Sequence, residues 1–449
     1  MRVGPLSGED SFHPLRALLR RISSSWLLLP ALVLIIGFGV GLALSALFET
    51  GEDGTRESAP APKSSGPSRD PKSERSFLTR VVPPPAGSLR GARPPTAIAR
   101  RVRSMSPEQK AAQLMLVGFG GTDATAPIFK RLPRRTYGGL MMEEGNYVDD
   151  QQFRVLTAEL QAQVTRARQA QPFLGAVQQG DEWNAVPALP PGAAPADTAN
   201  VSEAAAEARA TTRAFRRFGL NAIWAPSLEV GPEDGGAMGT RSFSDEPGQV
   251  AAYAQAALEE YSRGNMLSAA GRFPGMGAAA VPPEEGPPNV GLTLDELRAR
   301  DLVPFRAAVR AGTPAIVIGH GLYVTDDFVV PASLSSAVST NLLRNQLGFR
   351  GVAIADDLTL PAVTTSTPPA EAALRSIAAG VDMVYVPGPD GVIDETYNAL
   401  VNGIKRGGLK RRRVDEALTR ILIAKNDLGL LRKRKAPPAG QPALPPGTP

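Results

Sequence analysis

Eight short apolar runs, separated by longer amphipathic stretches, dominate the sequence between Thr96 and Leu431. The runs are rich in Val, Ile, Leu and Ala and almost free of charge, which is typical of strands buried on both faces of a parallel sheet. They are Gln113–Gly118, Tyr137–Met142, Pro172–Val177, Asn221–Pro226, Met266–Ala270, Ala315–Gly319, Gly351–Ala355 and Val381–Val386. Eight strand–helix units of this kind predict an α/β fold, a (β/α)8 barrel of the TIM type.

Helical periodicity fills the stretches between these runs. The predicted helices are Asp150–Arg168, Glu203–Phe218, Pro247–Arg263, Thr293–Ala311 and Ala370–Ala379. A doubly wound open sheet is the alternative arrangement of such units. No Gly-x-Gly-x-x-Gly motif follows the first strand, so the sequence offers no support for a dinucleotide-binding fold.

The N-terminal part of the chain predicts a membrane anchor. Residues Trp26–Phe48 carry no charge, and a helix of about 20 apolar residues is long enough to cross a bilayer. Arginines precede this run and acidic residues follow it, which predicts a cytoplasmic N-terminus and an extracytoplasmic barrel at the cell membrane, in a single-pass topology. A cleaved signal peptide is the alternative, because Ala43–Ala46 resembles a cleavage site.

Composition shifts divide the chain into five predicted segments. Stretches rich in Pro, Ser and Gly with few large apolar residues cannot bury enough surface to order themselves, so we expect a disordered linker before the barrel. The segments are 1–25 (basic, cytoplasmic), 26–48 (transmembrane anchor), 49–95 (disordered linker), 96–431 (barrel) and 432–449 (basic, Pro-rich tail).

The composition also limits the chemistry. The chain has no cysteine and two histidines, which excludes disulfides, thiol nucleophiles, cysteine-ligated metals and histidine-rich metal sites. No metal or organic cofactor is expected, because the chemistry inferred below uses side chains as both nucleophile and proton donor. The net charge is +5, and the basic runs Lys410–Arg413 and Arg432–Lys435 are interpreted as solvated helix faces, with no nucleic-acid partner expected.

Polar residues follow several of the predicted strands, where a TIM barrel places its active site. The seventh strand is followed by Asp356 and Asp357 and the sixth by His320. The loop after the fourth strand carries Glu229 and Arg241, and the loop after the fifth carries Arg272, Glu284 and Glu285. Paired carboxylates at a barrel mouth suit glycoside hydrolysis, in which one is the nucleophile and the other a proton donor. A helix cap or a loop hydrogen bond is the alternative role for a strand-end aspartate.

Several motifs resemble glycoside hydrolase family 3, and within it the single-barrel bacterial β-N-acetylhexosaminidases. The most specific is Gly348–Leu358 (GFRGVAIADDL), and Pro331–Ser335, Ala379–Met383, Asn221–Pro226 and Arg241–Phe243 are similar too. The resemblance extends from Ser104 to Leu428. It implies that Asp356 is a nucleophile that forms a covalent glycosyl-enzyme, that Arg241 holds the sugar, and that His320 is a strand-end residue with a structural or a substrate-binding role.

Other parts of the family pattern are altered. At the end of the third strand, Val177–Glu182 stands where the family has Asp-Gln-Glu-Gly-Gly-Arg. After the fourth, Glu229 replaces an aspartate, and at the fifth, Gly271–Gly277 replaces Lys-His-Phe-Pro-Gly-His-Gly. Arg272 and Glu229 are the substrate-binding residues expected from these segments. The resemblance places the family's Asp-Ser-His acid/base motif at Pro282–Glu284, where this chain has Pro-Pro-Glu instead. Losing a proton donor costs about 10²–10⁴-fold in rate. Glu284 is the candidate replacement, with Glu285 beside it, and a solvated loop is the alternative.

Two functions from different classes therefore remain open. The first is a membrane-anchored, exported, retaining glycosidase that acts on a cell-wall or other β-linked glycan. Glycans derived from peptidoglycan are among the candidate substrates. The second is a catalytically inactive barrel that binds glycan or a cell-envelope partner. A hydrolase with an altered substrate is a variant of the first, for which the lost sugar contacts are expected.

Overall fold

The computed structural model describes residues 95–232, 236–326 and 328–432, all of which belong to one compact unit within Glu74–Pro449. The predicted cytoplasmic segment, anchor and tail lie outside the described residues, as does the linker up to residue 94, apart from the first residue of the predicted tail, Arg432. Among the described helices, none combines the length and the apolar character that a bilayer crossing requires.

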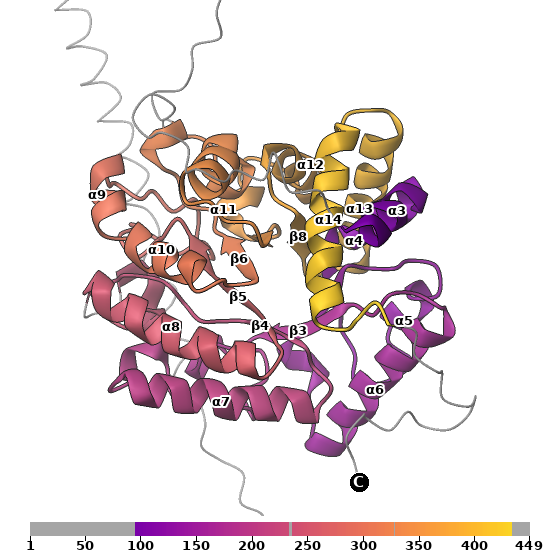
Figure 1. Cartoon of the computed structure of the whole chain (residues 1–449), viewed down its shortest axis with the longest axis horizontal. Helices are drawn as coiled ribbons and strands as arrows, with labels where there is room; N and C mark the ends of the chain where they lie inside the picture. The colour runs from indigo at the N-terminus through magenta and orange to yellow at the C-terminus, as the bar shows by residue number, and fades with distance from the viewer. Residues whose placement is uncertain (1–94, 233–235, 327, 433–449) are drawn as a thin grey trace, which may run out of the picture. The chain divides into compact units, whose positions relative to one another are not determined.

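Eight parallel strands close into a barrel, as predicted (Figure 1). They are β1 (Met115–Val117), β2 (Gly139–Met142), β3 (Phe173–Val177), β4 (Ala222–Trp224), β5 (Leu267–Phe273), β6 (Ala315–Ile318), β7 (Val352–Asp357) and β8 (Met383–Val386). Each strand pairs with its neighbours in the sequence, and β8 returns to pair with β1. Nearly every strand residue is buried, because side chains fill the barrel on one face and helices cover the other.

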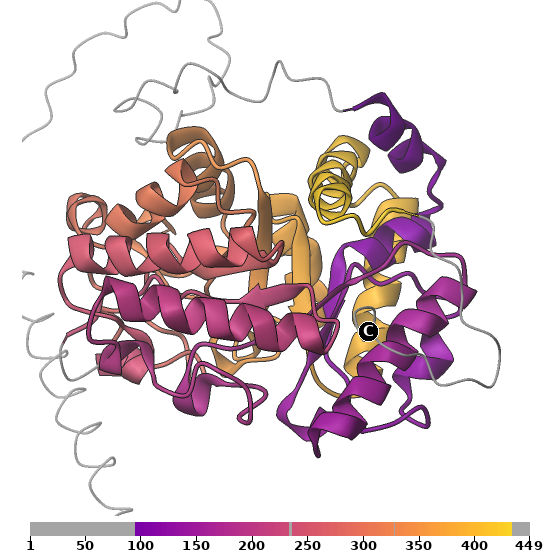
Figure 2. The same cartoon turned by 60° about the horizontal axis from the view of Figure 1, so that its bottom comes forward.

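Helices surround the barrel (Figure 2). The longer ones are α3 (Thr96–Ser104), α4 (Pro107–Gln113), α6 (Asp150–Arg166), α7 (Val201–Arg217), α8 (Pro247–Arg263), α12 (Pro369–Ala379), α13 (Asp390–Lys405), α14 (Arg411–Asp427) and a π-helical segment, η7 (Ala337–Gln346). Short helices α5 (Ile128–Arg131) and α11 (Pro361–Thr364) lie in loops. Figure 1 shows α7 and α8 side by side, and α3 beside α14.

Four of the five predicted helices are confirmed, and the fifth is interrupted. The segment expected as Thr293–Ala311 forms α9 (Leu294–Ala299) and α10 (Leu302–Arg310). Arg300 leaves the helical conformation, with φ −111° and ψ −83°, and the next residue, Asp301, is fully buried. A period of 3.6 residues runs through both helices, so the sequence pattern alone does not reveal the break.

A buried aspartate joins the last strands to the C-terminal helix. Asp382 accepts hydrogen bonds from Arg344 (2.5 Å), Arg413 (2.5 Å), Arg420 (3.0 Å) and the backbone N–H of Ala353 (3.1 Å). Burial alone would raise the pKa of Asp382, but the three arginines outweigh it and the pKa lies below its ordinary value. The interpretation of the run at 410–413 as a solvated face is therefore wrong for Arg413, whose side chain is 15% exposed.

Candidate active site

Asp356 lies at the carboxyl end of β7 and is 7% exposed. Arg272 donates a hydrogen bond from Nε to Asp356 Oδ2, and both side chains are 10% exposed. Asp356 and Arg272 belong to the strands themselves, since β7 runs to Asp357 and β5 runs to Phe273. The expectation that they follow the strands is wrong, because β7 and β5 continue two and three residues past their predicted ends at Ala355 and Ala270.

The electrostatic surroundings favour an ionised Asp356. Burial pushes the pKa of this carboxyl upward, but Arg272, His320 and Arg241 pull it down, and the net shift is below the ordinary value. The dominant favourable contribution comes from the Arg272 guanidinium, which is itself buried. Asp356 is therefore a carboxylate near neutral pH, the form that a nucleophile requires.

His320 uses both ring nitrogens within the protein. Nε2 lies 2.9 Å from the backbone oxygen of Asp357, and Nδ1 lies 2.8 Å from the Ser333 hydroxyl. A carbonyl oxygen only accepts, so Nε2 carries the proton and Nδ1 accepts from Ser333. Burial lowers the pKa of His320, which keeps the ring neutral. The ring holds the end of β7 in place, and the structure leaves neither nitrogen for a sugar.

Glu229 is fully buried beneath the loop that follows β5. Its two carboxylate oxygens accept the backbone N–H groups of Arg272 (3.0 Å) and Met276 (2.6 Å). Burial raises the pKa of this carboxyl, against the lowering effect of the two hydrogen bonds. The expectation that Glu229 contacts substrate does not fit this geometry. The carboxyl group is buried, and both of its oxygens accept hydrogen bonds from the backbone, which they hold in place.

Arg241 is 4% exposed and makes few contacts for a buried guanidinium. Nη2 donates to Glu284 Oε1 at 3.0 Å, and the guanidinium carbon lies 3.4 Å from the centre of the Trp183 ring. Nε and Nη1 are buried with no hydrogen-bond partner among the described residues. Burial and the nearby Arg272 lower the pKa of Arg241 to about 10, so it remains a cation. Its unpaired N–H groups suit oxygen acceptors of a ligand.

Trp183 is a residue of this site that the sequence reasoning missed. It lies in a short 3-10 helix (Asp181–Trp183) after β3, and its indole N–H donates to the Thr240 hydroxyl at 3.0 Å. Gln178 is fully buried and donates to the carbonyls of Val186 (3.1 Å), Leu189 (2.9 Å) and Pro190 (3.2 Å), which fixes the β3 loop. A tryptophan in a Gly- and Pro-rich loop after a strand was the signal available.

Two further carboxyl groups lie at the same end of the barrel, of which the sequence indicated Asp357 but not Glu143. Tyr385 of β8 donates its hydroxyl proton to Glu143 Oε1 at 2.5 Å, and Glu143 directly follows β2. Burial raises the pKa of Glu143, and it raises the pKa of Asp357 to about 7. Asp357 also accepts hydrogen bonds from the Thr359 backbone (2.7 Å) and hydroxyl (2.6 Å).

Comparison with known proteins identifies the family. A model of the glycosyl hydrolase family 3 N terminal domain matches residues 106–424. The chain belongs to glycoside hydrolase family 3. A β-hexosaminidase of Stenotrophomonas maltophilia is 31% identical over 293 residues, which cover 64% of this chain and 87% of that protein. A β-hexosaminidase of Neisseria gonorrhoeae is 30% identical over 277 residues, covering 59% and 75%. The resemblance seen in the sequence motifs is thus confirmed.

Solved structures of family 3 proteins share the fold. A β-N-acetylglucosaminidase of a Paenibacillus species superposes with a TM-score of 0.71 at 24% identity, covering 76% of this chain and 66% of that one. A family 3 glycosyl hydrolase of Mycobacterium smegmatis superposes with a TM-score of 0.64 at 25% identity, covering 72% and 98%. The (β/α)8 barrel predicted from the sequence is the fold of both.

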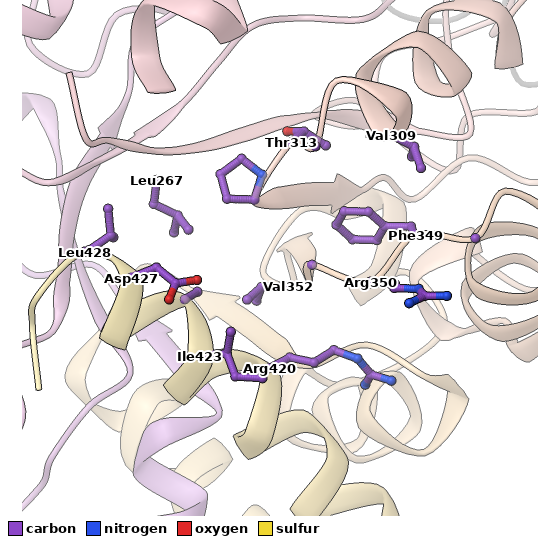
Figure 3. Close-up of a pocket in the computed structure, with 15 residues that line it drawn as sticks. Leu267, Val309, Thr313, Phe349, Arg350, Val352, Arg420, Ile423, Asp427 and Leu428 are labelled. Carbon is purple, nitrogen blue, oxygen red and sulfur yellow. The ribbon is translucent and has the colours of Figure 1, made fainter. Parts of the chain in front are cut away.

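A cavity lies at the other end of this family 3 barrel, and Figure 3 shows the residues that line it. It measures about 430 Å³ and is lined by the amino ends of β5, β6 and β7 and by α14, with Leu267, Pro314, Val352 and Ile423 among its residues. TIM barrels carry their active sites at the carboxyl ends of the strands. The cavity is therefore separate from the Asp356 site. Among the described residues, no group of three or more His, Asp or Glu side chains is arranged to hold a metal ion.

Proposed function

We propose that this family 3 protein is a retaining glycosidase that cleaves β-linked glycans with Asp356 as its nucleophile. The observation that carries the proposal is the buried, ionised Asp356 at the barrel mouth, with the guanidinium of Arg272 bonded to one oxygen. Its other oxygen, Oδ1, is not engaged by Arg272 and is the atom that we assign to attack. The β-hexosaminidases to which the chain is similar support a hexosamine substrate.

The chemistry proceeds in two displacements. Asp356 Oδ1 attacks the anomeric carbon, the bond to the leaving oxygen breaks with its electron pair, and a proton from an acid neutralises that oxygen. Water then attacks the anomeric carbon, the ester to Asp356 breaks, and the carboxylate is restored. Arg241 supplies N–H groups for sugar oxygens, while Glu229 and His320 hold the backbone of β5 and β7 in position.

One observation favours the second candidate, an inactive barrel that binds glycan. Glu284, the acid expected from the sequence, accepts a hydrogen bond from Arg241 and is 40% exposed, so this contact holds it as an acceptor. Pro282 and Pro283 precede it, and neither can carry a proton. An inactive barrel would keep Arg241 and Trp183 as a binding platform and turn over no glycoside.

Mass spectrometry of the full chain after incubation with fluorinated glycosyl inactivators separates the two candidates. We expect one sugar of the glucose, xylose or N-acetylglucosamine type to add stoichiometrically to Asp356, and Asp356→Ala to abolish the adduct. Absence of any adduct, together with sugar binding in titration calorimetry, would instead establish the inactive barrel.

We further propose that residues 26–48 anchor the protein in the cell membrane, with the linker 49–95 carrying the barrel on the extracytoplasmic side, close to cell-wall glycan. The uncharged run and the preceding arginines support this placement. Membrane fractionation combined with protease treatment of intact cells tests it. We expect the barrel in the membrane fraction and accessible from outside; release of a shortened chain would favour signal-peptide cleavage.

A further inference from the structure

Cleavage at Asp356 requires a proton donor, and the structure holds a second carboxyl group at the same barrel mouth. Glu143 follows β2 directly, so it emerges at the carboxyl ends of the strands. The hydroxyl of Tyr385 reaches it at 2.5 Å, and Tyr385 is the register partner of Asp357. Tyr385 therefore links the Glu143 carboxyl to β8, the strand that pairs with the nucleophile's strand β7.

The surroundings leave a shaped space for this carboxyl. Gly118 follows β1, and a Cβ at that position would lie 2.4 Å from Glu143 Oε1, so a larger residue there would displace the carboxyl. Oε1 is thus held between Tyr385 and the end of β1. The Glu143 side chain also accepts a hydrogen bond from the backbone N–H of Asn146 in a capping box, and it stays partly exposed at the barrel mouth, where a ligand can reach it.

Burial also affects the ionisation of Glu143. Burial raises the pKa of Glu143 above its ordinary value, although the Tyr385 hydroxyl opposes this shift. A raised pKa favours the protonated form of a carboxyl, which is the form that can donate a proton to a leaving group. Glu284 is 40% exposed and bonded to a guanidinium, which fits a role in holding Arg241 in place.

We propose that Glu143 is the general acid/base of this active site and that Tyr385 is the residue that positions it. This inference rests on the proposed function, in which Asp356 is the nucleophile. In the first displacement Glu143 transfers its proton to the leaving oxygen as that oxygen takes the electron pair of the broken bond. In the second, Glu143 takes a proton from the attacking water as the ester to Asp356 breaks, so protons and electrons balance without another reactant.

Leaving-group dependence and azide rescue test the assignment in the full chain, with aryl glycosides of the sugar that labels Asp356. Removal of an acid/base costs about 10²–10⁴-fold on substrates with poor leaving groups. We expect that loss for Glu143→Ala with an alkyl glycoside, and a much smaller loss in the first step with a 2,4-dinitrophenyl glycoside. Added azide should restore turnover of the dinitrophenyl substrate, by attacking the anomeric carbon, displacing Asp356 and yielding a β-glycosyl azide.

The matched control is Glu144→Ala, since Glu144 is the exposed neighbour of Glu143 and should leave both steps unchanged. Glu143→Gln keeps the shape of the side chain and so guards against misfolding. It should show the same pattern as Glu143→Ala, with a large rate loss on the alkyl glycoside and a small one on the dinitrophenyl glycoside. Tyr385→Phe should lower kcat with little change in KM. Two results would overturn the assignment of Glu143 while leaving Asp356 as the nucleophile. One is labelling of Asp356 without azide rescue in Glu143→Ala, and the other is azide rescue in Glu284→Ala instead. Failure of every inactivator to label Asp356 would overturn the proposed function with it.

Discussion

At the scale of single residues, the ion pair between Arg272 and Asp356 sets the ionisation of the proposed nucleophile. Arg272→Met removes the cation that most lowers the pKa of Asp356, while burial continues to raise it. Because the carboxylate is the reactive form, the acidic limb of the kcat/KM profile should move to higher pH, and the maximal rate should fall at least tenfold. A pH–rate series on the full chain measures both effects.

The control for this change is Arg217→Met, which removes an arginine whose side chain is 52% exposed and pairs with Asp150 on the surface. Its profile should match that of the unmodified protein. An unchanged acidic limb in Arg272→Met would show that Asp356 is ionised by other means, and would weaken its assignment as a nucleophile tuned by Arg272.

A second prediction at this scale concerns Asp301, at the break between α9 and α10. Asp301 is fully buried, neither oxygen has a hydrogen-bond partner among the described residues, and Arg300 lies 3.6 Å away. Burial raises the pKa of Asp301 to about 7, against 3.8 ordinarily. The folded state therefore holds an extra proton between these values, and its stability falls as the pH rises through that window.

Asp301→Asn removes the charge and nearly keeps the shape. We expect the melting temperature of the variant to exceed that of the unmodified protein at pH 8, where ionisation of the buried carboxyl costs about 1.4 kcal/mol per unit of pKa shift. The two should melt alike near pH 4, where both side chains are neutral. Thermal melts across this range decide the matter, and a difference that does not depend on pH would contradict the prediction.

At the scale of elements, Asp382 binds the end of the β7–β8 connection to η7 and α14 through three arginines. Removing one partner from a buried ion pair leaves uncompensated charge and costs about 3–5 kcal/mol. Asp382→Ala should therefore lower the free energy of unfolding by roughly that amount. Asp295→Ala is the control, because the Asp295 side chain is 93% exposed and should cost little. Urea titrations compare them, and equal midpoints would contradict the prediction.

The elements were also the part that the sequence predicted best. All eight strands appear where the apolar runs lie, since strands buried on both faces must be apolar throughout. The site was predicted less completely. Asp356, Arg272 and Arg241 come together as expected, but Glu229 and His320 turn inward to bond with backbone groups. Glu143 and Tyr385 escaped notice because their contact joins residues 242 positions apart, which no local pattern records.

At the scale of the whole molecule, closure of the barrel makes every strand depend on both of its neighbours, and α14 packs against the barrel beside α3. Leu418, Ile421 and Leu422 of α14 are fully buried. A closed sheet has no edge at which one strand could separate alone, so damage to α14 should weaken the folded unit as a whole. Replacing a buried leucine with alanine typically costs about 2–5 kcal/mol.

Leu418→Ala should therefore lower one common unfolding transition. Far-ultraviolet circular dichroism, tryptophan fluorescence and protection of the Asp356 site from proteolysis should all shift to the same lower midpoint, although Trp183 and Asp356 lie on other elements. Arg412→Ala, at a position where the side chain is 83% exposed, should leave the midpoint in place. Separate transitions in circular dichroism and fluorescence would contradict this prediction. They would show that the half of the barrel bearing Trp183 and Arg241 folds independently of α14, so that this half of the active site is stabilised separately from the half bearing Asp356.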